Sequence, residues 1–374
     1  MTMLNFCDLA VPGVRELKPY QPGKPIEELQ REYGLREVIK LASNENPLGP
    51  SPRALAALTS GMDELARYPD GNGFALKQAL ADKFSVEVNQ ITLGNGSNDI
   101  LELVARTFVQ PGEEVIFSQH AFAVYPIATQ AVGGKAVIVP AKDWANDLDA
   151  IGEAINANTR VIFIANPNNP TGTWIDGDSL KQFLDKVPER VIVVLDEAYY
   201  EYAIHPALQV SGYPDGMQYL NDHPNLIVSR TFSKAYGLAG LRVGYAVSNS
   251  AIADLLNRVR QPFNVNSLGL LAATAALSDI EHLEKSAQLN ANGMQQCISE
   301  FQKLSLSYIV SAGNFISVDM GKPAQPIYQA LLERGVIVRP VANYEMPNHL
   351  RITIGTQQEN ARFLSVLHEV LSAS

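Results

Sequence analysis

Lys234 lies in the stretch SRTFSKAYGLAGLRVGY (residues 229–245), where most other side chains are small or apolar. An amine in apolar surroundings has a lowered pKa, because burial disfavours the charged ammonium form, and the neutral amine is a nucleophile for aldehydes. Thr231, Ser233 and Arg242 supply two hydroxyls and a guanidinium, which suit a phosphate group. A lysine that merely extends from the surface fits poorly, because no polar face surrounds this one. The stretch therefore indicates a reactive amine beside an anion site.

A carboxylate and a phenol follow another apolar run. Asp196 ends the run in VIVVLDEAYYEY, and Tyr199 comes three residues later. Burying a carboxylate is unfavourable unless a cation or several donors face it. The cation is either part of a ligand or, equally well, an arginine in a structural salt bridge.

A glycine turn precedes a helical pattern in TLGNGSNDILELVARTF, and the turn contains Ser97 and Asn98. Free backbone amides at a helix start, together with the Ser97 hydroxyl, suit a phosphate. An ordinary N-capped helix explains the same pattern equally well. The motif is therefore a weak indication by itself.

Asn169 precedes Pro170 in IANPNNPTG, after the apolar run VIFI. The asparagine amide can hold a ligand oxygen, and the alternative is a rigid turn without a ligand. We predict a cis peptide bond between the two residues, as is found in about 5% of X–Pro bonds.

The elements that must position these residues are short apolar runs that alternate with helical stretches between about residues 90 and 250. The runs are QITLGNG, EVIFSQ, KAVIVPA, RVIFIANP, VIVVLDEAY, NLIVSRTF and LRVGYAVS. Continuously apolar runs are typical of strands buried on both faces of a largely parallel sheet, so the fold class is α/β. In such sheets, ligands bind at the carboxyl ends of the strands, which is where the polar residues above lie.

Three parts of the chain differ in pattern. The first 45 residues are rich in Pro and Gly, include one helical piece near PIEELQREYG, and are predicted to form an arm that packs with a small domain. Residues 46–265 are predicted to form a large cofactor-binding domain. Residues 266–374, with long helical segments and the strands SYIVSAGNFISVDM, GVIVRPV and HLRITIG, are predicted to form a smaller α+β domain.

Composition limits the function. The 374 residues suffice for two domains, and the formal net charge of −10 disfavours nucleic acid or an anionic membrane as a partner. Cys7 and Cys297 lack the spacing of a metal site or a disulfide framework, so no metal is expected, and Cys297 reads as a core residue. Since no apolar stretch could span a membrane and the start of the chain lacks the pattern of an export signal, we expect a cytoplasmic protein.

The four polar places together provide a lysine for an aldehyde, a carboxylate for a ring nitrogen, two donors for a phenolic oxygen and a phosphate cradle. These are the requirements of pyridoxal 5′-phosphate, whose ring nitrogen must stay protonated for the ring to accept electrons. One such motif is a weak signal, but four in this order are a strong one.

The same motifs carry a family resemblance over essentially the whole chain. The order GNGSND, NPNNPTG, DEAY, SRTFSKAYGLAGLRVGY, HLRITIG resembles the fold-type I pyridoxal-phosphate aminotransferases. More narrowly, LKPYQPGKP, LASNENPLGP, RYPDGNG, SQHAFAVY and the pair Arg339 and Arg351 resemble the histidinol-phosphate aminotransferases of histidine biosynthesis. The resemblance implies a large domain with a mostly parallel seven-stranded sheet and a smaller α+β domain.

The resemblance also implies roles for the polar residues. Lys234 would bond to the cofactor aldehyde and move the proton of the reaction. Asp196 would pair with the ring nitrogen, and Asn169 and Tyr199 would contact the phenolic oxygen. Residues implied to hold the cofactor phosphate are Ser97, Asn98, Thr231, Ser233 and Arg242. Tyr68, in RYPDGNG, would reach the phosphate of a neighbouring subunit's cofactor, so we expect a homodimer with shared active sites.

The sequence departs from the family pattern at SQHAFAVY, where Phe122 replaces the Tyr or Trp that relatives often place over the cofactor ring. Stacking needs only the ring face, so it persists, while any polar contact of a hydroxyl is lost. Tyr125 either belongs to the core or lines the pocket. His120 is interpreted as structural, because Lys234 already supplies the acid–base group.

Arg351, in HLRITIG, matches the arginine that binds the substrate α-carboxylate in most aminotransferases of this fold. Histidinol phosphate carries a phosphate monoester instead, so the resemblance implies that Arg351, Arg339 and Tyr20 bind that phosphate, with Asn169 beside them. Arg351 would also bind the carboxylate of glutamate or 2-oxoglutarate, since a forked guanidinium suits both anions. Ordinary salt bridges are the alternative, and they suit Arg339 better than Arg351.

The implied reaction interconverts L-histidinol phosphate and 2-oxoglutarate with imidazole-acetol phosphate and L-glutamate. An aromatic-amino-acid aminotransferase would keep every cofactor residue, and a threonine-phosphate decarboxylase would also bind a phosphorylated substrate, so both stay as alternatives. A cofactor-sensing transcription regulator is disfavoured, because the arm ahead of the cofactor domain is too short and too nearly neutral for a DNA-binding domain.

Overall fold

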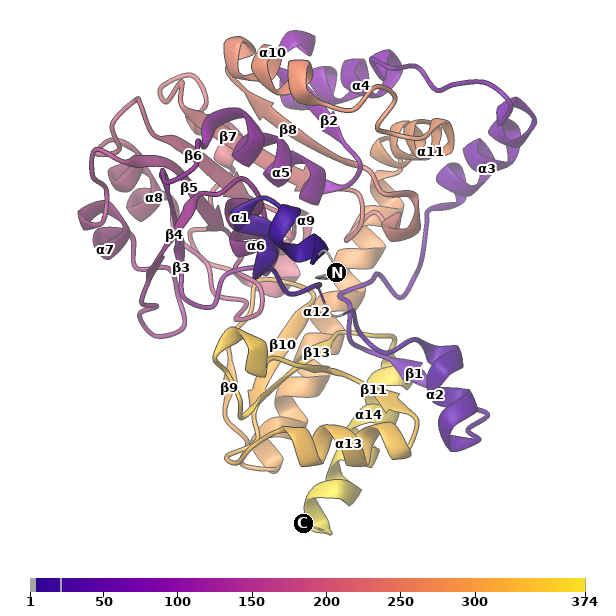
Figure 1. Cartoon of the computed structure of the whole chain (residues 1–374). Coiled ribbons are helices and arrows are strands. Elements are labelled where there is room, and N and C mark those ends of the chain that lie inside the picture. The colour runs from indigo at the N-terminus through magenta and orange to yellow at the C-terminus, as the bar shows by residue number, and fades with distance from the viewer. Residues whose placement is uncertain (1–4, 21, 374) are drawn as a thin grey trace.

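Seven strands form the central sheet of the computed structural model, which describes residues 5–20 and 22–373 (Figure 1). In chain order the strands are β2 (Ile91–Gly94), β3 (Glu114–Ser118), β4 (Lys135–Val139), β5 (Thr159–Ala165), β6 (Ile192–Asp196), β7 (Leu226–Thr231) and β8 (Gly244–Ser248). Their spatial order is β2-β8-β7-β6-β5-β3-β4, and β8 is the one strand of this sheet that runs antiparallel to the other six. The predicted α/β class and the mostly parallel seven-stranded sheet are confirmed.

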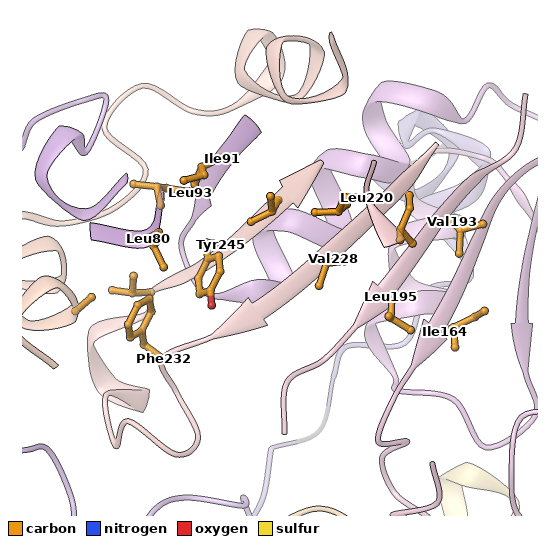
Figure 2. Packing of buried hydrophobic residues seen from close by; sticks show 14 of the residues in the cluster. Leu80, Ile91, Leu93, Ile164, Val193, Leu195, Leu220, Val228, Phe232 and Tyr245 are labelled. Carbon is orange, nitrogen blue, oxygen red and sulfur yellow. The ribbon is translucent and has the colours of Figure 1, made fainter. Parts of the chain in front are cut away.

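The strands are buried because both faces of the sheet carry a hydrophobic core. Successive side chains of a strand point to opposite faces. In β6, Val193 and Leu195 therefore belong to one core, while Ile192 and Val194 belong to the other. Figure 2 shows the first of these cores, in which Val228 and Tyr245 of the next strands join Leu195.

Helices cover the two faces. The core drawn in Figure 2 is closed by α3 (Pro52–Gly61), α4 (Phe74–Phe84), α7 (Leu148–Glu153), α8 (Gly177–Leu184) and α11 (Ser267–Leu277). The opposite core is closed by α5 (Ser97–Phe108), α6 (Val124–Ala131) and α10 (Ser250–Val259). The short helix α9 (Tyr200–Ala203) follows β6. Short 3-10 helices occur at η1 (Phe6–Leu9), η2 (Met62–Glu64), η3 (Val88–Gln90), η4 (Pro206–Leu208), η5 (Gly216–Tyr219), η6 (Ala239–Leu241) and η7 (Ala342–Tyr344).

The C-terminal part has its own antiparallel sheet of order β12-β13-β10-β9. Its strands are β9 (Tyr308–Ile309), β10 (Phe315–Asp319), β12 (Arg339–Pro340) and β13 (His349–Thr353). Three helices pack against it: α12 (Ile280–Lys303), α13 (Gln325–Glu333) and α14 (Gln357–Ser372). Cys297 is buried in this core, as predicted, with Met294 and Phe301 of the same helix.

The N-terminal segment contacts both parts. Helix α1 (Pro12–Arg15) lies against α6, whereas β1 (Ile39–Lys40), which follows α2 (Ile26–Tyr33), pairs in parallel with β11 (Val336–Ile337). Helix α11 packs against α3 and α4, although it begins just beyond the predicted end of the large domain at residue 265. The division into an arm and two domains stays a prediction. Within residues 5–20 and 22–373, no helix is long and apolar enough to cross a membrane.

Helix α5 begins where β8 passes closest to it. A Cβ atom added at Gly244 would lie 2.3 Å from the Ser97 backbone nitrogen and 2.5 Å from the Gly96 carbonyl carbon. Both are backbone atoms, which cannot rotate away. Glycine at 244 therefore allows the start of α5 to lie directly against the sheet.

We expect Gly244→Ala to lower the free energy of unfolding by at least about 1–3 kcal/mol, because the added methyl forces backbone atoms apart. The measurement is the urea midpoint of the cofactor-free protein. Gly240→Ala is the matched control, since a Cβ at Gly240 meets nothing within 4 Å. An unchanged midpoint for Gly244→Ala would contradict the close approach.

Candidate active site

One pocket lies at the carboxyl ends of β5, β6 and β7, and every predicted site residue except Tyr68 lines it. The predicted residues in its wall are Tyr20, Ser97, Asn98, Phe122, Asn169, Asp196, Tyr199, Thr231, Ser233, Lys234, Arg242, Arg339 and Arg351. They come from segments spread over most of the chain, including the N-terminal segment and β12 and β13. The rule that ligands bind at the carboxyl ends of parallel strands, applied to the sequence, therefore leads to residues that share one pocket.

Lys234 follows β7 and is only partly exposed. Its Nζ donates a hydrogen bond to the Ser43 carbonyl oxygen at 3.1 Å and lies 5.6 Å from the centre of the Tyr199 ring. Burial, together with the positive charge of Arg351, lowers the pKa of the amine to about 7. At neutral pH a large fraction of this amine is therefore uncharged and nucleophilic.

Asp196 ends β6 and is buried. Its Oδ2 accepts a hydrogen bond from the Tyr125 hydroxyl at 3.0 Å, while its Oδ1 has no hydrogen-bond partner among the described residues. Burial raises the pKa of the carboxyl to about 6, against the opposing effects of the Tyr125 hydrogen bond and the Lys234 charge. Among the described residues, no arginine forms a salt bridge with Asp196. The structural salt bridge that the sequence left as an alternative is therefore not found in this part of the structure.

An anion cradle lies at the start of α5. The residue that caps this helix is Gly96, which offers no capping side chain, so the alternative of an ordinary side-chain N-cap is not found. Arg242 Nη1 donates to the Ser233 hydroxyl at 3.2 Å, and a Cβ atom added at Gly96 would lie 2.4 Å from Arg242 Nη2. The guanidinium thus lies beside the N-cap residue of α5, and the guanidinium and the helix start both attract an anion.

Asn169 and Arg351 form the opposite wall. The Asn169–Pro170 peptide bond is cis, as predicted, and the Asn166–Pro167 bond is also cis. Arg351 donates from Nη1 to Asn169 Oδ1 at 2.5 Å and from Nη2 to the Ala42 carbonyl oxygen at 2.7 Å, and its Nε has no partner among the described residues. Since the guanidinium can only donate, Oδ1 of Asn169 faces the arginine and its Nδ2 is left to donate elsewhere.

The mouth of the pocket carries a second arginine. The Arg339 guanidinium lies 5.8 Å from the centre of the Tyr20 ring, and Tyr20 is about half exposed. Arg339 and Arg351 are register partners on β12 and β13. Two guanidiniums and a phenol therefore border the side of the pocket that an anionic substrate group would reach.

Tyr68 lies outside this pocket. Its side chain is 82% exposed, and its ring stacks on Phe263 with the ring centres 4.8 Å apart. The predicted contact across a subunit boundary stays a prediction.

Several pocket groups carry no prediction from the sequence. They are the Ala42 and Ser43 carbonyls, the Asn44 side chain and Tyr344, all in the wall of the pocket. Tyr125, for which the sequence left the core and the pocket wall as alternatives, is a core residue that lies behind Asp196. Asn44 follows β1, so the rule that polar residues at strand ends form the site could have singled it out. His120 does not line the pocket: its Nδ1 lies 2.6 Å from the backbone carbonyl oxygen of Tyr344, a residue of the pocket wall.

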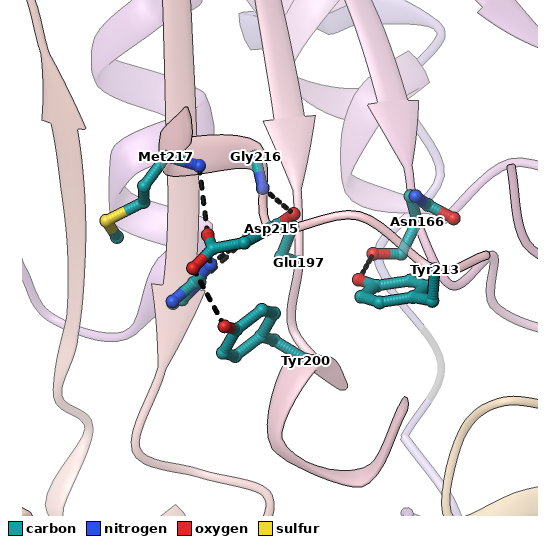
Figure 3. Close-up of polar contacts among 8 residues, drawn as sticks. Asn166, Glu197, Tyr200, Tyr213, Asp215, Gly216 and Met217 are labelled. Atoms are coloured by element: carbon teal, nitrogen blue, oxygen red, sulfur yellow. Dashed lines mark hydrogen bonds and ion pairs between the residues drawn. The ribbon is translucent and has the colours of Figure 1, made fainter. Parts of the chain in front are cut away.

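A buried ion pair lies on the other side of the same strand ends (Figure 3). Glu197 accepts from Arg230 Nε at 2.9 Å and Nη2 at 2.6 Å, and also from the Gly216 amide at 2.9 Å. Asp215 accepts from Arg230 Nη2 at 2.5 Å and from the Tyr200 hydroxyl at 2.9 Å. Glu197 and Arg230 are immediate neighbours of Asp196 and Thr231, so this network fixes the strand ends that carry the pocket.

Comparison with known proteins agrees with this geometry. A sequence model of the class I and II aminotransferases matches residues 36–367. The chain is 64% identical to histidinol-phosphate aminotransferase 2 of Pseudomonas fluorescens (strain Pf0-1), over 98% of this chain and 99% of that protein. It is 60% identical to histidinol-phosphate aminotransferase 2 of Pseudomonas aeruginosa, over 99% of this chain and the whole of that protein.

The chain belongs to the histidinol-phosphate aminotransferases. A solved structure of a family member, that of Sinorhizobium meliloti in complex with pyridoxal-5′-phosphate, superimposes with a TM-score of 0.89 at 31% identity. The match covers 97% of this chain and 98% of that chain. The predicted fold-type I architecture, the aminotransferase activity and the cofactor are thereby confirmed.

The pocket residues of this aminotransferase fit pyridoxal phosphate. The free Oδ1 of buried Asp196 is an acceptor for a protonated ring nitrogen, whose positive charge would return the carboxyl pKa toward its ordinary range. The cradle of Arg242, Ser233 and the α5 amides suits the phosphate. The partly neutral Lys234 amine suits the aldehyde.

We expect acylation of Lys234 in the cofactor-free protein to rise with pH around a midpoint near 7, because only the neutral amine reacts. The measurement is pH-dependent labelling followed by peptide mass spectrometry. The same peptide in urea-unfolded protein is the control, since an unperturbed lysine has a pKa of about 10.4. Arg351→Gln should move the folded midpoint upward. A folded midpoint close to that of the unfolded control would contradict the assignment.

Proposed function

We propose that this aminotransferase interconverts L-histidinol phosphate and 2-oxoglutarate with imidazole-acetol phosphate and L-glutamate, as a step of histidine biosynthesis. The observation that carries the proposal is the pairing of Arg351 with Arg339 and Tyr20 at the mouth of the pocket that contains Lys234. Most substrates of this fold present a single carboxylate there, while a phosphate monoester is a bulkier dianion that two guanidiniums and a phenol suit.

Three residues carry the chemistry. When bound, pyridoxal phosphate supplies an aldehyde carbon that takes up the amino group and a ring that accepts the electron pair released at the substrate Cα. Lys234 Nζ would take the proton from Cα and pass it to the former aldehyde carbon in one half-reaction, and would move a proton in the opposite direction in the other. Asp196 Oδ1 holds the ring-nitrogen proton in place, and Tyr199 donates to the phenolic oxygen.

The remaining pocket residues bind and orient. Phe122 covers the ring face, and its own ring meets Tyr125 edge-on with centres 6.1 Å apart. Asn169 Nδ2, turned from Arg351, donates to the phenolic oxygen and borders the substrate. The phosphate of the cofactor is held by Ser97, Asn98, Thr231, Ser233 and Arg242.

Arg351 serves both substrates. It is buried, and its Nε, which has no partner among the residues that the structure describes, leaves a donor for the carboxylate of glutamate or the phosphate of histidinol phosphate. Arg339 and Tyr20, nearer the mouth, complete the phosphate site. A cytoplasmic location stays an expectation from the sequence.

The proposal includes a homodimer with shared sites, in which Tyr68 reaches the phosphate of the neighbouring subunit's cofactor. Large apolar side chains are exposed close to Tyr68 in the sequence, namely Met62, Leu65 and Phe74, and exposed Phe263 stacks on its ring. An exposed apolar cluster of this kind usually marks a protein–protein interface. The large domain (46–265), the small domain (266–374) and the N-terminal arm (1–45) would then each contribute to the two sites.

The substrate is tested by one half-reaction. Cofactor-loaded protein mixed with L-histidinol phosphate alone should lose its visible absorption and release imidazole-acetol phosphate, one equivalent per site. Arg339→Gln should lower kcat/KM for histidinol phosphate about 10–100-fold, which corresponds to the loss of one charge-assisted hydrogen bond, with a smaller effect for glutamate. Lys234→Ala should give no turnover.

Other outcomes would redirect the proposal. A higher kcat/KM for phenylalanine than for histidinol phosphate would favour the aromatic-amino-acid aminotransferase. Release of CO2 from a phosphorylated amino acid would favour the decarboxylase. Turnover by Lys234→Ala would contradict the catalytic assignment.

The shared site is tested by complementation. Homodimers of Lys234→Ala and of Tyr68→Phe should each be impaired, the second through weaker cofactor binding. A mixed dimer of the two should regain one intact site of its two, because the intact Lys234 of one chain meets the intact Tyr68 of the other. Mixed dimers that show only the average of the two defects would contradict sharing.

A further inference from the structure

Asn44 lies between Tyr199 and strand β13. It follows β1, is 1% exposed and adopts a left-handed backbone with φ of 55°, a conformation that asparagine tolerates better than most residues. Its Nδ2 lies 2.8 Å from the Tyr199 hydroxyl, and its Oδ1 lies 3.0 Å from the Thr353 hydroxyl. Its backbone nitrogen donates to the same Thr353 hydroxyl at 2.9 Å, and its carbonyl accepts from Asn314 Nδ2 at 3.1 Å.

The chemistry of the donors fixes the direction of each hydrogen bond. A backbone N–H can only donate, so the Thr353 hydroxyl accepts from Asn44 N and must send its own proton elsewhere. The available acceptor is Asn44 Oδ1, which accepts that proton. With Oδ1 used in this way, the Nδ2 end of the amide faces Tyr199 and donates to its oxygen. The Tyr199 proton then cannot point toward Asn44.

We propose that Asn44 and Thr353 are positioning residues that turn the Tyr199 hydroxyl proton into the pocket, toward the cofactor's phenolic oxygen. The inference rests on the proposed role of Tyr199. Tyr199 is buried and lines the pocket, so its proton has a partner there when the cofactor is bound. The relay runs one way, from the backbone amide of Asn44 to the cofactor oxygen.

The relay starts on the strand that carries the substrate arginine. Thr353 and Arg351 are two residues apart on β13, so their side chains lie on the same face of that strand. Arg351 Nη2 donates a hydrogen bond to the Ala42 carbonyl oxygen at 2.7 Å, and the Thr353 hydroxyl donates one to Asn44 Oδ1. The segment 42–44 is thus attached at both ends to the strand that binds the substrate anion.

The test compares two Asn44 variants with the unaltered protein, all cofactor-loaded, by the pH titration of the visible absorption. Asn44→Asp keeps the acceptor for Thr353 but replaces the donor with a carboxylate oxygen, so the Tyr199 proton should turn away from the cofactor. Loss of that hydrogen bond to an oxygen anion should raise the titration midpoint by about one pH unit. Asn44→Gly removes the side chain, and glycine tolerates the left-handed backbone at this position. This variant should raise the titration midpoint by less than Asn44→Asp does, and it should bind the cofactor more weakly in equilibrium dialysis.

A double-mutant comparison separates hydroxyl direction from the added charge. In a Tyr199→Phe background no hydroxyl can turn, so Asn44→Asp should shift the midpoint by much less than it does beside Tyr199. Equal shifts in the two backgrounds would overturn the inference. The groups whose charges face Tyr199, namely Arg351, Asp196, Tyr344 and Lys234, are the same in both.

A matched pair at Thr353 covers the case in which Asn44 variants fail to fold. Thr353→Ser keeps the hydroxyl and should titrate like the unaltered protein, whereas Thr353→Val should titrate like Asn44→Gly. The same midpoint for both would overturn the inference. If the unaltered protein binds no cofactor, the proposed function fails instead, and the two failures are distinguishable.

Discussion

The site depends on the ion pair between Arg230 and Glu197, because this pair determines which side chains at the ends of β6 and β7 point into the pocket. Residues alternate between the two faces along a strand. With Glu197 and Arg230 held on one side of β6 and β7, Asp196 and Thr231 must face the other, where the pocket lies. A slip of one residue would exchange the two carboxylates. Both partners are fully buried, so loss of either would leave an uncompensated charge, which is strongly destabilising.

The cations of the pocket act on one another as well as on ligands. One pocket is lined by four basic side chains, although the net charge of the chain is −10. They are Lys234, Arg242, Arg339 and Arg351. Arg351 and Arg242 both lower the Lys234 pKa by repulsion. An anion bound beside the arginines offsets their charge, so ligand binding and the basicity of the lysine are coupled. The same side chains therefore bind the substrate and tune the amine that reacts with it.

The sheet and most of the pocket residues could be predicted from the sequence. Each buried strand of a parallel sheet appears in the sequence as a local apolar run, and the site residues follow the ends of these runs. Lys234, Asp196, Asn169 and Ser97 all follow this rule. Contacts between distant residues leave no such local pattern. Tyr125 reaches Asp196 across 71 positions and Asn44 reaches Tyr199 across 155, and only the folded chain brings these pairs together. The family resemblance supplied the substrate residues, which periodicity alone does not indicate.

The attachment of segment 42–44 to β13 limits how this enzyme can be altered. Arg351 and Thr353 share one face of a short strand and hold the backbone that carries Asn44. Redesign of that strand for a different substrate would shift the segment and, with it, the surroundings of Tyr199. Substitutions in this strand are therefore expected to change substrate preference and cofactor reactivity together. A library of variants made to alter one of these properties should be screened for both.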